Sequence, residues 1–303
     1  MNPPLAVFGN LSIDDLVFVD GSTRWAVPGG NAMYAGLGMS IWSEQAMIVA
    51  PVGPDYPLAP FLDRVDLSRC PPVPKTLRSW GLYEEDGSRH FIFRNETKNW
   101  ESFCPSPDSA GNGHQVAAHV APMPRETALG LIRELRKTGT QIIAIDLDER
   151  DLHAITVDKV TDLLRSADLF LPSNQETRAI FRDHKPVEAL RRLRELGPDV
   201  PLIAVKCGAD GVVGHAAGSD HFISVPAVPI DLVDATGGGD SFCGGVLAGY
   251  TQTKDVVDAL LYGVVSASFC VEALGLEGLL AANKEEALAR VAKTRARITF
   301  HPM

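Results

Sequence analysis

Residues 234–240 read Asp234-Ala235-Thr236-Gly237-Gly238-Gly239-Asp240 and run directly into Ser241-Phe242-Cys243-Gly244-Gly245. Three consecutive glycines carry no Cβ, so the backbone can turn tightly and bring several N–H groups close to an anion. Apolar residues follow the turn at helical spacing. The turn is therefore predicted to lie at a helix N-terminus, where unpaired N–H groups and the helix dipole favour a phosphate.

Asp240 closes this turn and has two interpretations. It could cap the helix, because Asp is a favoured capping residue, or it could act on a ligand bound at the turn. Other phosphate loops do not fit. A Walker A loop needs a Lys followed by Ser or Thr after the glycines, and a dinucleotide fingerprint needs Gly-x-Gly-x-x-Gly, which no stretch of the chain supplies.

The segment resembles the signature of the ribokinase-like (PfkB) family of carbohydrate and nucleoside kinases, Asp-Thr-Thr-Gly-Ala-Gly-Asp. Ala235 and Gly238 replace the second and fifth residues, and both are small-residue changes. The resemblance implies that Asp240 is the catalytic base, because phosphoryl transfer needs a carboxylate to accept the hydroxyl proton. It also implies that an anion hole for the transferring phosphate is formed by the amides of Gly237, Gly238 and Gly239.

The amino end carries a second match. Residues 5–9 read as a short buried strand, and Asp14 lies five residues beyond Gly9, which resembles the family's Gly-x-x-x-x-Asp. There the Asp binds substrate hydroxyls, and a carboxylate can accept bonds from two vicinal hydroxyls. The alternative is a solvated turn residue. Gly30 and Asn31 resemble the family's substrate and hinge motif, with Tyr34 where many sugar kinases have Asn.

Residues 76–83 and 90–94 flank an Asp-Gly turn, which predicts a β-hairpin. In the family such strands, with the segment near 16–19, form a lid over the substrate. Arg78 and Arg94 are candidates for contacts with the substrate in the closed site; the alternative is that they are solvated on the outer face of the lid. Exposed lid edges in relatives either pair between subunits or stay capped, so a homodimer through the lid is an open expectation.

Two further motifs point to the nucleotide side. Residues 172–176 resemble Pro-Asn-x-x-Glu, which implies that Ser173 approaches the nucleotide and that Glu176 orders Mg²⁺ through water. Residues 206–211 resemble the family's nucleotide loop and implicate Lys206, Gly208 and Gly211, together with Gly239. The alternatives are an ordinary acid at a helix N-terminus and an ordinary tight turn.

Two weaker matches complete the motifs. Residues 146–150 resemble Asp-x-Asn-x-Arg with Asp148 in place of Asn, although a bare acidic cluster is more often a solvated loop. Asp234 and Thr236 match positions that border a K⁺ site in relatives activated by monovalent cations.

The rest of the chain alternates apolar strands with helical segments. Strands are predicted at 116–120, 141–146, 168–171 and 202–205, and helices at 126–137, 157–165, 187–196 and 255–271. This alternation predicts an α/β fold with a doubly wound, mostly parallel sheet flanked by helices, which is ribokinase-like with a small β lid. We expect residues 1–303 to form one domain, with lid strands inserted at about 14–25 and 75–96.

Composition narrows the partners. A net charge of −10 argues against binding to nucleic acid or to an anionic membrane. We found no apolar run long enough to span a bilayer and no signal-peptide pattern at the start, which predicts a cytoplasmic protein. Five scattered cysteines indicate neither a disulfide framework nor a zinc site.

The sequence thus predicts a kinase that uses ATP and Mg²⁺ to phosphorylate a hydroxyl of a small polyhydroxylated molecule. The acceptor could be a sugar, a sugar acid, an inositol or a nucleoside; Tyr34 and the aromatic lid favour a larger or cyclic one. The alternative is a catalytically idle sugar- or nucleotide-binding sensor of the same fold.

Overall fold

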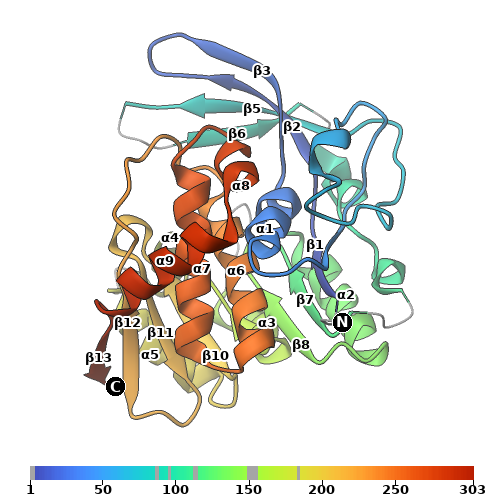
Figure 1. Cartoon of the computed structure of the whole chain (residues 1–303). Coiled ribbons are helices and arrows are strands. Elements are labelled where there is room, and N and C mark those ends of the chain that lie inside the picture. The colour runs from blue at the N-terminus through green and yellow to red at the C-terminus, as the bar shows by residue number, and fades with distance from the viewer. Residues whose placement is uncertain (1–3, 86–88, 95–96, 112–114, 149–155, 183–184) are drawn as a thin grey trace.

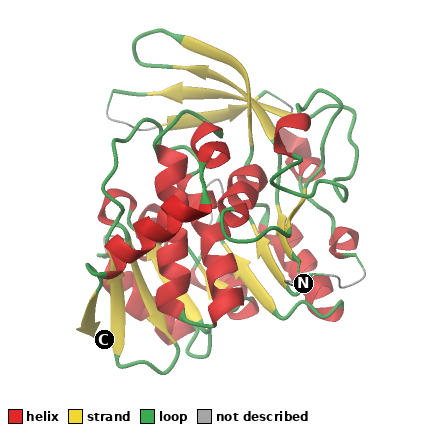
Figure 2. Ribbon diagram, in the orientation of Figure 1, coloured by secondary structure: helices red, strands yellow, loops and turns green. Residues whose placement is uncertain are grey.

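The computed structural model describes residues 4–85, 89–94, 97–111, 115–148, 156–182 and 185–303. They form a large sheet covered by helices on both faces, with a second, smaller sheet at one end (Figure 1 and Figure 2). None of the helices in these ranges is both long and apolar enough to cross a membrane.

The large sheet has nine strands in the order β13-β12-β11-β10-β9-β8-β7-β1-β4. The strands from β4 to β10 run parallel, and β11, β12 and β13 add antiparallel pairs at the other edge. The central strands are apolar and buried on both faces, which is the pattern of a covered parallel sheet. Their bounds are β1 (Leu5–Phe8), β4 (Ala46–Val49), β7 (Ala117–Val120), β8 (Ile142–Ile145), β9 (Leu169–Phe170), β10 (Leu202–Lys206), β11 (Val212–Ala216), β12 (His221–Val225) and β13 (Thr299–Pro302).

Helices cover the two faces of this sheet as separate layers, each with its own apolar core. One layer contains α1 (Asn31–Ser40), α6 (Gly238–Thr253), α7 (Val256–Val271), α8 (Glu277–Ala281) and α9 (Lys284–Arg295). The other contains α2 (Arg125–Lys137), α3 (Val157–Ser166), α4 (Asn174–Phe181) and α5 (Pro186–Leu196). The predicted fold class is confirmed, and the predicted helices correspond to α2, α3, α5 and α7.

The small residues after the triglycine turn explain how α6 is fixed in place. A Cβ on Gly244 would lie 1.9 Å from the carbonyl oxygen of Ala35 in α1, and one on Gly245 would lie 2.6 Å from the carbonyl oxygen of Tyr262 in α7. Only glycine permits these close backbone approaches. The N-terminus of α6 is therefore held between two neighbouring helices, at the carboxyl ends of the parallel strands.

The smaller sheet is the lid, with strand order β3-β2-β5-β6. Its strands are β2 (Ser12–Val17), β3 (Thr23–Gly29), β5 (Leu77–Tyr83) and β6 (Arg89–Phe93). β5 and β6 pair antiparallel as the predicted hairpin, whose turn lies outside the described residues. That the lid and the large sheet make one domain stays a prediction.

Register places three rows of residues across one face of the lid. The first row joins Asp14, Ser79 and Phe93; the second joins Leu16, Gly81 and Phe91; the third pairs Tyr83 with Arg89. Residues directly opposite one another in paired strands share a face. This face looks toward the main sheet, because its third row contacts the residues just before the triglycine turn.

Candidate active site

The triglycine turn forms the start of α6, as its sequence predicts. Gly237 is the N-cap in the left-handed conformation, with φ 74°, and Gly238 is the first helical residue. A Cβ on Gly237 would lie 2.1 Å from Cδ1 of Tyr34, so the tyrosine ring packs directly on the bare turn. Asp240 lies in the first helical turn and is half-buried. One carboxylate therefore stands among the first amides of α6, which lack partners within the helix.

Asp14 is the carboxylate of the lid face. It is 7% exposed and accepts hydrogen bonds from the hydroxyls of Ser12, at 3.0 Å, and Ser79. Burial raises the pKa of Asp14 to about 6, although the two serine hydroxyls act in the opposite direction. The residue is not the solvated turn acid of the alternative interpretation, because it is buried inside a strand.

The two candidate arginines lie elsewhere on the lid. Arg94 pairs with Asp15, and its guanidinium lies 4.5 Å from the ring centroid of Trp80. Asp15 and Trp80 are register partners on the face opposite Asp14 and Ser79. Arg78 pairs with Asp55 at 3.1 Å. The structure therefore does not bring these arginines together with Asp14.

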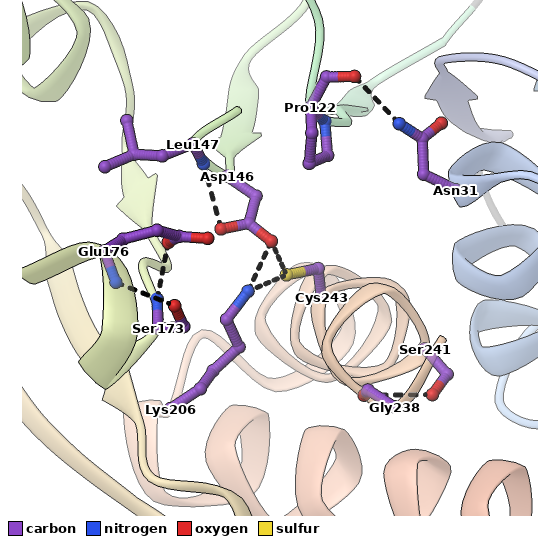
Figure 3. Close-up of polar contacts among 10 residues, drawn as sticks. All are labelled: Asn31, Pro122, Asp146, Leu147, Ser173, Glu176, Lys206, Gly238, Ser241 and Cys243. Carbon is purple, nitrogen blue, oxygen red and sulfur yellow. Dashed lines mark hydrogen bonds and ion pairs between the residues drawn. The ribbon is translucent and has the colours of Figure 1, made fainter. Parts of the chain in front are cut away.

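Gly30 and Asn31 support the loop that leads into β2. Gly30 has φ 103°, and a Cβ there would lie 2.4 Å from the carbonyl oxygen of Asn10. The Asn31 amide accepts a bond from the Asn10 N–H at 2.8 Å. It also donates one to the Pro122 carbonyl at 2.8 Å (Figure 3). Both ends of the Asn31 amide are thus bound to backbone, and the pair fixes the path of the chain toward Asp14.

A buried ionic cluster lies beside the turn, formed by residues of the motifs for which the sequence predicts a nucleotide role (Figure 3). Lys206, at the end of β10, pairs with Asp146, which follows β8. The Lys206 Nζ lies 3.8 Å from the Cys243 Sγ, and a Cβ on Gly239 would lie 3.5 Å from the same nitrogen. The ammonium group is therefore adjacent to the third glycine of the turn.

Ser173 and Glu176 complete this side. They form a capping box at the start of α4, in which Ser173 N–H donates to Glu176 Oε2 at 2.7 Å and Glu176 N–H donates to Ser173 Oγ at 3.1 Å. Glu176 is also buried near the cluster: burial, and then the Asp146 charge, raise its pKa to about 8. Glu176 therefore caps α4 and lies near the buried Lys206–Asp146 pair.

The loop after β10 contains two glycines with positive φ. Gly211 has φ 90°, and a Cβ there would lie 2.1 Å from the Val225 carbonyl oxygen, so it is required by the turn into β11. Gly208 has φ 58° and no atom within 4 Å of the position of a Cβ, so its surroundings are open. A backbone bond from Lys206 N–H to the Pro172 carbonyl, at 2.8 Å, joins this loop to the segment with Ser173.

Two site residues in the hairpin were not singled out from the sequence, and a third was named only as part of a weak match. Asp146, the first residue of the 146–150 match after β8, is the ion-pair partner of Lys206, a role that the sequence did not assign to it. Tyr83 and Arg89, in the hairpin, reach Asp234 and Thr236. Of the remaining Asp-x-Asn-x-Arg match, Asp148 is buried and Arg150 lies outside the described residues.

Comparisons with known proteins agree with this architecture. The chain is 27% identical over 266 residues to a cytidine kinase of Thermococcus kodakarensis, covering 86% of this chain and 93% of that protein. Two solved structures share the fold: a Methanocaldococcus jannaschii nucleoside kinase (TM-score 0.75, 19% identity, 96% and 99% covered) and an Arabidopsis thaliana ribokinase complexed with ribose and ATP (0.76, 19%, 96% and 99%).

The family model described as pfkB family carbohydrate kinase matches residues 63–282, which is more than half of the chain. The matched part includes the lid hairpin, the Lys206 cluster and the triglycine turn with Asp240. This chain belongs to the PfkB family of carbohydrate kinases, ATP-dependent phosphotransferases that act on an alcohol group.

Proposed function

We propose that this kinase transfers the γ-phosphoryl group of ATP to a hydroxyl of a cyclic polyol, with a nucleoside as the first acceptor to test. One observation carries the proposal: the lid face with Asp14 and the turn with Asp240 are joined across the site by the third lid row. A nucleoside also agrees with the cytidine kinase to which the chain is similar.

Asp240 is the proposed base. Its place in the first turn of α6 would let the carboxylate accept the proton of the attacking hydroxyl while the amides of Gly237, Gly238 and Gly239 offset the charge on the transferring group. Because phosphoryl transfer depends mainly on positioning and charge neutralisation, no further covalent chemistry is required of the protein.

Asp14 is the proposed anchor for the acceptor. Its carboxylate would accept two neighbouring hydroxyls, and Gly30 and Asn31 hold the chain that carries it. Beyond it, the second lid row is apolar: the Leu16 and Phe91 side chains close over Gly81, and this apolar surface suits a base next to a ribose. Arg78 and Arg94 have no place in this arrangement.

Lys206, with Ser173 and the glycine loop at Gly208 and Gly211, is the proposed phosphate and nucleotide side. Asp146 and Glu176 offer carboxylate oxygens there, the donor type that Mg²⁺ prefers. The described residues contain no group of three or more His, Cys, Asp and Glu side chains that could hold a metal, which fits an ion held mostly by water and phosphate oxygens. When bound, Mg²⁺ would neutralise charge on the phosphates.

Three finer proposals accompany this function. Asp234 and Thr236 could border a K⁺ ion, but both already bind Arg89, so added K⁺ should change turnover little. The lid exposes Trp25 (62%) and Ile92 (52%), which a second copy of the chain could cover as a homodimer. A cytoplasmic location agrees with five cysteines that remain thiols and form no disulfide.

The test is ADP release with Mg²⁺ and ATP over a panel of nucleosides, sugars, sugar acids and inositols, with and without K⁺. Asp240→Asn should lower turnover by about 10²–10⁴-fold while leaving ATP affinity nearly unchanged. Asp231→Asn, an exposed acid earlier in the same loop, is the matched control and should behave as wild type. ATP binding without ADP release for any acceptor would instead favour the sensor.

A further inference from the structure

The far end of the lid is bonded to the segment that begins the triglycine turn. The Tyr83 hydroxyl donates to Asp234 Oδ2 at 3.0 Å and lies 3.1 Å from Thr236 Oγ1. An Arg89 Nη1 donates to the same Thr236 oxygen at 3.1 Å and lies 3.8 Å from Asp234 Oδ1. Two strands of the lid thus contact two residues that precede Asp240 by six and four positions.

The four side chains form one hydrogen-bonded network in which the donor of each bond can be assigned. Tyr83 has a single hydroxyl proton, which goes to the buried Asp234 carboxylate, so the Thr236 hydroxyl donates to Tyr83 and accepts from Arg89. Burial, together with the Asp234 charge, raises the pKa of Tyr83 to about 12, so it stays a donor at neutral pH. The hydrogen-bonded network therefore begins at the Arg89 guanidinium on the lid and ends at the Asp234 carboxylate in the main body. Hydrogen bonds with a charged partner are strong.

Asp234 is also bonded to the turn itself. Its Oδ1 accepts the Thr236 N–H at 2.9 Å, and the N–H groups of Val233 and Asp234 donate to the Val271 carbonyl at the end of α7, at 2.9 and 3.2 Å. The Cys270 thiol donates to the Thr236 carbonyl at 3.3 Å. Asp234 thus connects the lid and the start of the anion turn through its carboxylate, and the end of α7 through its backbone N–H.

We propose that Tyr83 and Arg89 are positioning residues that fasten the lid to the anion turn, so that the acceptor face with Asp14 is aligned with Asp240. The inference rests on the proposed function and deepens it. A hydroxyl bound at Asp14 must reach a phosphate held by residues 237–240, which directly follow Thr236. Small misplacements of reacting groups cost large factors in rate. Fastening the lid also keeps water from the transferring group.

The kinetic test compares Tyr83→Phe, Arg89→Met and Arg89→Lys with Arg24→Met. Arg24 lies exposed on the same lid and bonds only locally, to the Thr23 carbonyl, which makes it a matched control. Tyr83→Phe and Arg89→Met should each lower kcat/KM for the acceptor about 10-fold or more. KM for ATP should change less than about 2-fold, because Lys206 and Ser173 lie in the main body. Arg89→Lys should recover part of the loss, since it keeps the charge beside Asp234.

A second measurement needs no acceptor. Amide hydrogen exchange of the unliganded protein should rise in residues 77–83 and in residues 234–240 together in Tyr83→Phe and Arg89→Met, and in neither segment in Arg24→Met. Wild-type kcat/KM in both Tyr83→Phe and Arg89→Met, with Asp240→Asn inactive, would overturn the fastening role and leave the kinase assignment intact. If the wild type phosphorylates nothing, the kinase proposal fails, and unchanged exchange at 234–240 would then end the fastening proposal as well.

Discussion

The two sides of the site hold their carboxylates in different ways. On the nucleotide side, Asp146 is paired with the ammonium of Lys206, and both side chains are nearly buried, with 4% and 11% exposed. On the lid, the Asp14 carboxylate accepts hydrogen bonds from the hydroxyls of Ser12 and Ser79, and it pairs with no Lys or Arg among the residues that the structure describes. Besides burial, the charge of Asp15, another acid, raises the pKa of Asp14. The Asp146 carboxylate is thus neutralised by a cation of the protein, whereas the Asp14 carboxylate is held by the neutral hydroxyls of two serines.

This difference shows what each side must do. The charges beside the turn must be fixed before ATP binds, because a preorganised site does not have to reorient its dipoles during the reaction. The hydrogen-bonding capacity of the Asp14 carboxylate, in contrast, is only partly used by the two serines. Acceptor positions therefore remain for the hydroxyls of a polyol. Substitutions around Lys206 should therefore weaken folding and activity together, whereas Asp14→Asn should weaken acceptor binding without weakening the fold.

Among the substitutions that compare these two sides of the site, the largest effect is expected for Lys206→Met. It leaves two buried carboxyl groups, Asp146 and Glu176, without their cation, and breaking a buried pair from one side costs about 3–5 kcal/mol of unfolding free energy. ADP release should fall by at least about 100-fold, since the amine next to Gly239 is lost. Urea unfolding and the ADP assay measure the two effects.

Lys293→Met, at an exposed position on α9, is the control for the Lys206 variant and should change neither quantity. Lys206→Met/Asp146→Asn should regain much of the stability but not the activity, because it removes the unpaired charge without restoring the ammonium group. Full stability of the single variant Lys206→Met would show that the Lys206 ammonium does not stabilise the buried Asp146 carboxylate, contrary to what their contact indicates.

The sequence predicted these two sides unequally. The parallel sheet and the motifs of the main body follow from local patterns: apolar strands, glycine turns and acids at strand ends. The capping box was visible as Ser173 and Glu176 three residues apart. The partner of Lys206 was not, because the pairing joins residues 60 positions apart and depends on strand order, which no local pattern gives.

The lid shows the same limit more sharply. Its hairpin was predictable, but which face of each strand looks toward the site depends on register with β2, a strand more than 60 residues earlier in the chain. Arg94 and Arg89 were therefore indistinguishable in the sequence, and the interpretation favoured Arg94. Register places Arg94 on the face opposite Asp14 and Arg89 on the same face as Tyr83.

The next effect in size is expected for Asp14→Asn. The amide loses the charge that strengthens each bond to a hydroxyl, which corresponds to about 100-fold in kcat/KM for the acceptor if two bonds are weakened. KM for ATP should hardly change, and the unfolding free energy near neutral pH should not fall, because the variant has no ionised carboxyl group to bury. Asp15→Asn, one residue along on the opposite face, is the matched control: it should affect stability through Arg94 but leave the acceptor KM unchanged.

The dependence of kcat/KM and of stability on pH should also reflect the lack of a counter-charge at Asp14, with a smaller effect. With the pKa of Asp14 raised to about 6, kcat/KM for the acceptor should fall up to about 10-fold per pH unit below 6, as the carboxyl takes a proton. The raised pKa also means that the folded state keeps a proton that the unfolded chain has lost. This group's contribution to stability is therefore present below pH 3.8 and is lost as the pH rises through 6.

Comparison with Asp14→Asn assigns this pH dependence to one side chain. The variant should lose both the acid limb near pH 6 in kcat/KM for the acceptor and the matching slope of unfolding free energy, measured by urea titration at several pH values. An acid limb that persists unchanged in the variant would move the titration to another group, such as Asp240.

The smallest effect is expected for Arg94→Met. The arginine side chain is 37% exposed and bonds the buried Asp15, which keeps the Ala26 N–H as a donor at 2.9 Å when the guanidinium is removed. A partly exposed pair of this kind, with a cation–π contact to Trp80, contributes about 1 kcal/mol or less. Acceptor KM and turnover should stay within about 2-fold of wild type, because Arg94 lies opposite Arg78 and pairs with Asp15, on the lid face away from Asp14. A loss comparable to that of Asp14→Asn would mean that the lid turns this arginine into the site when the acceptor binds, and the division between an inner, reacting face and an outer, supporting face would have to be abandoned.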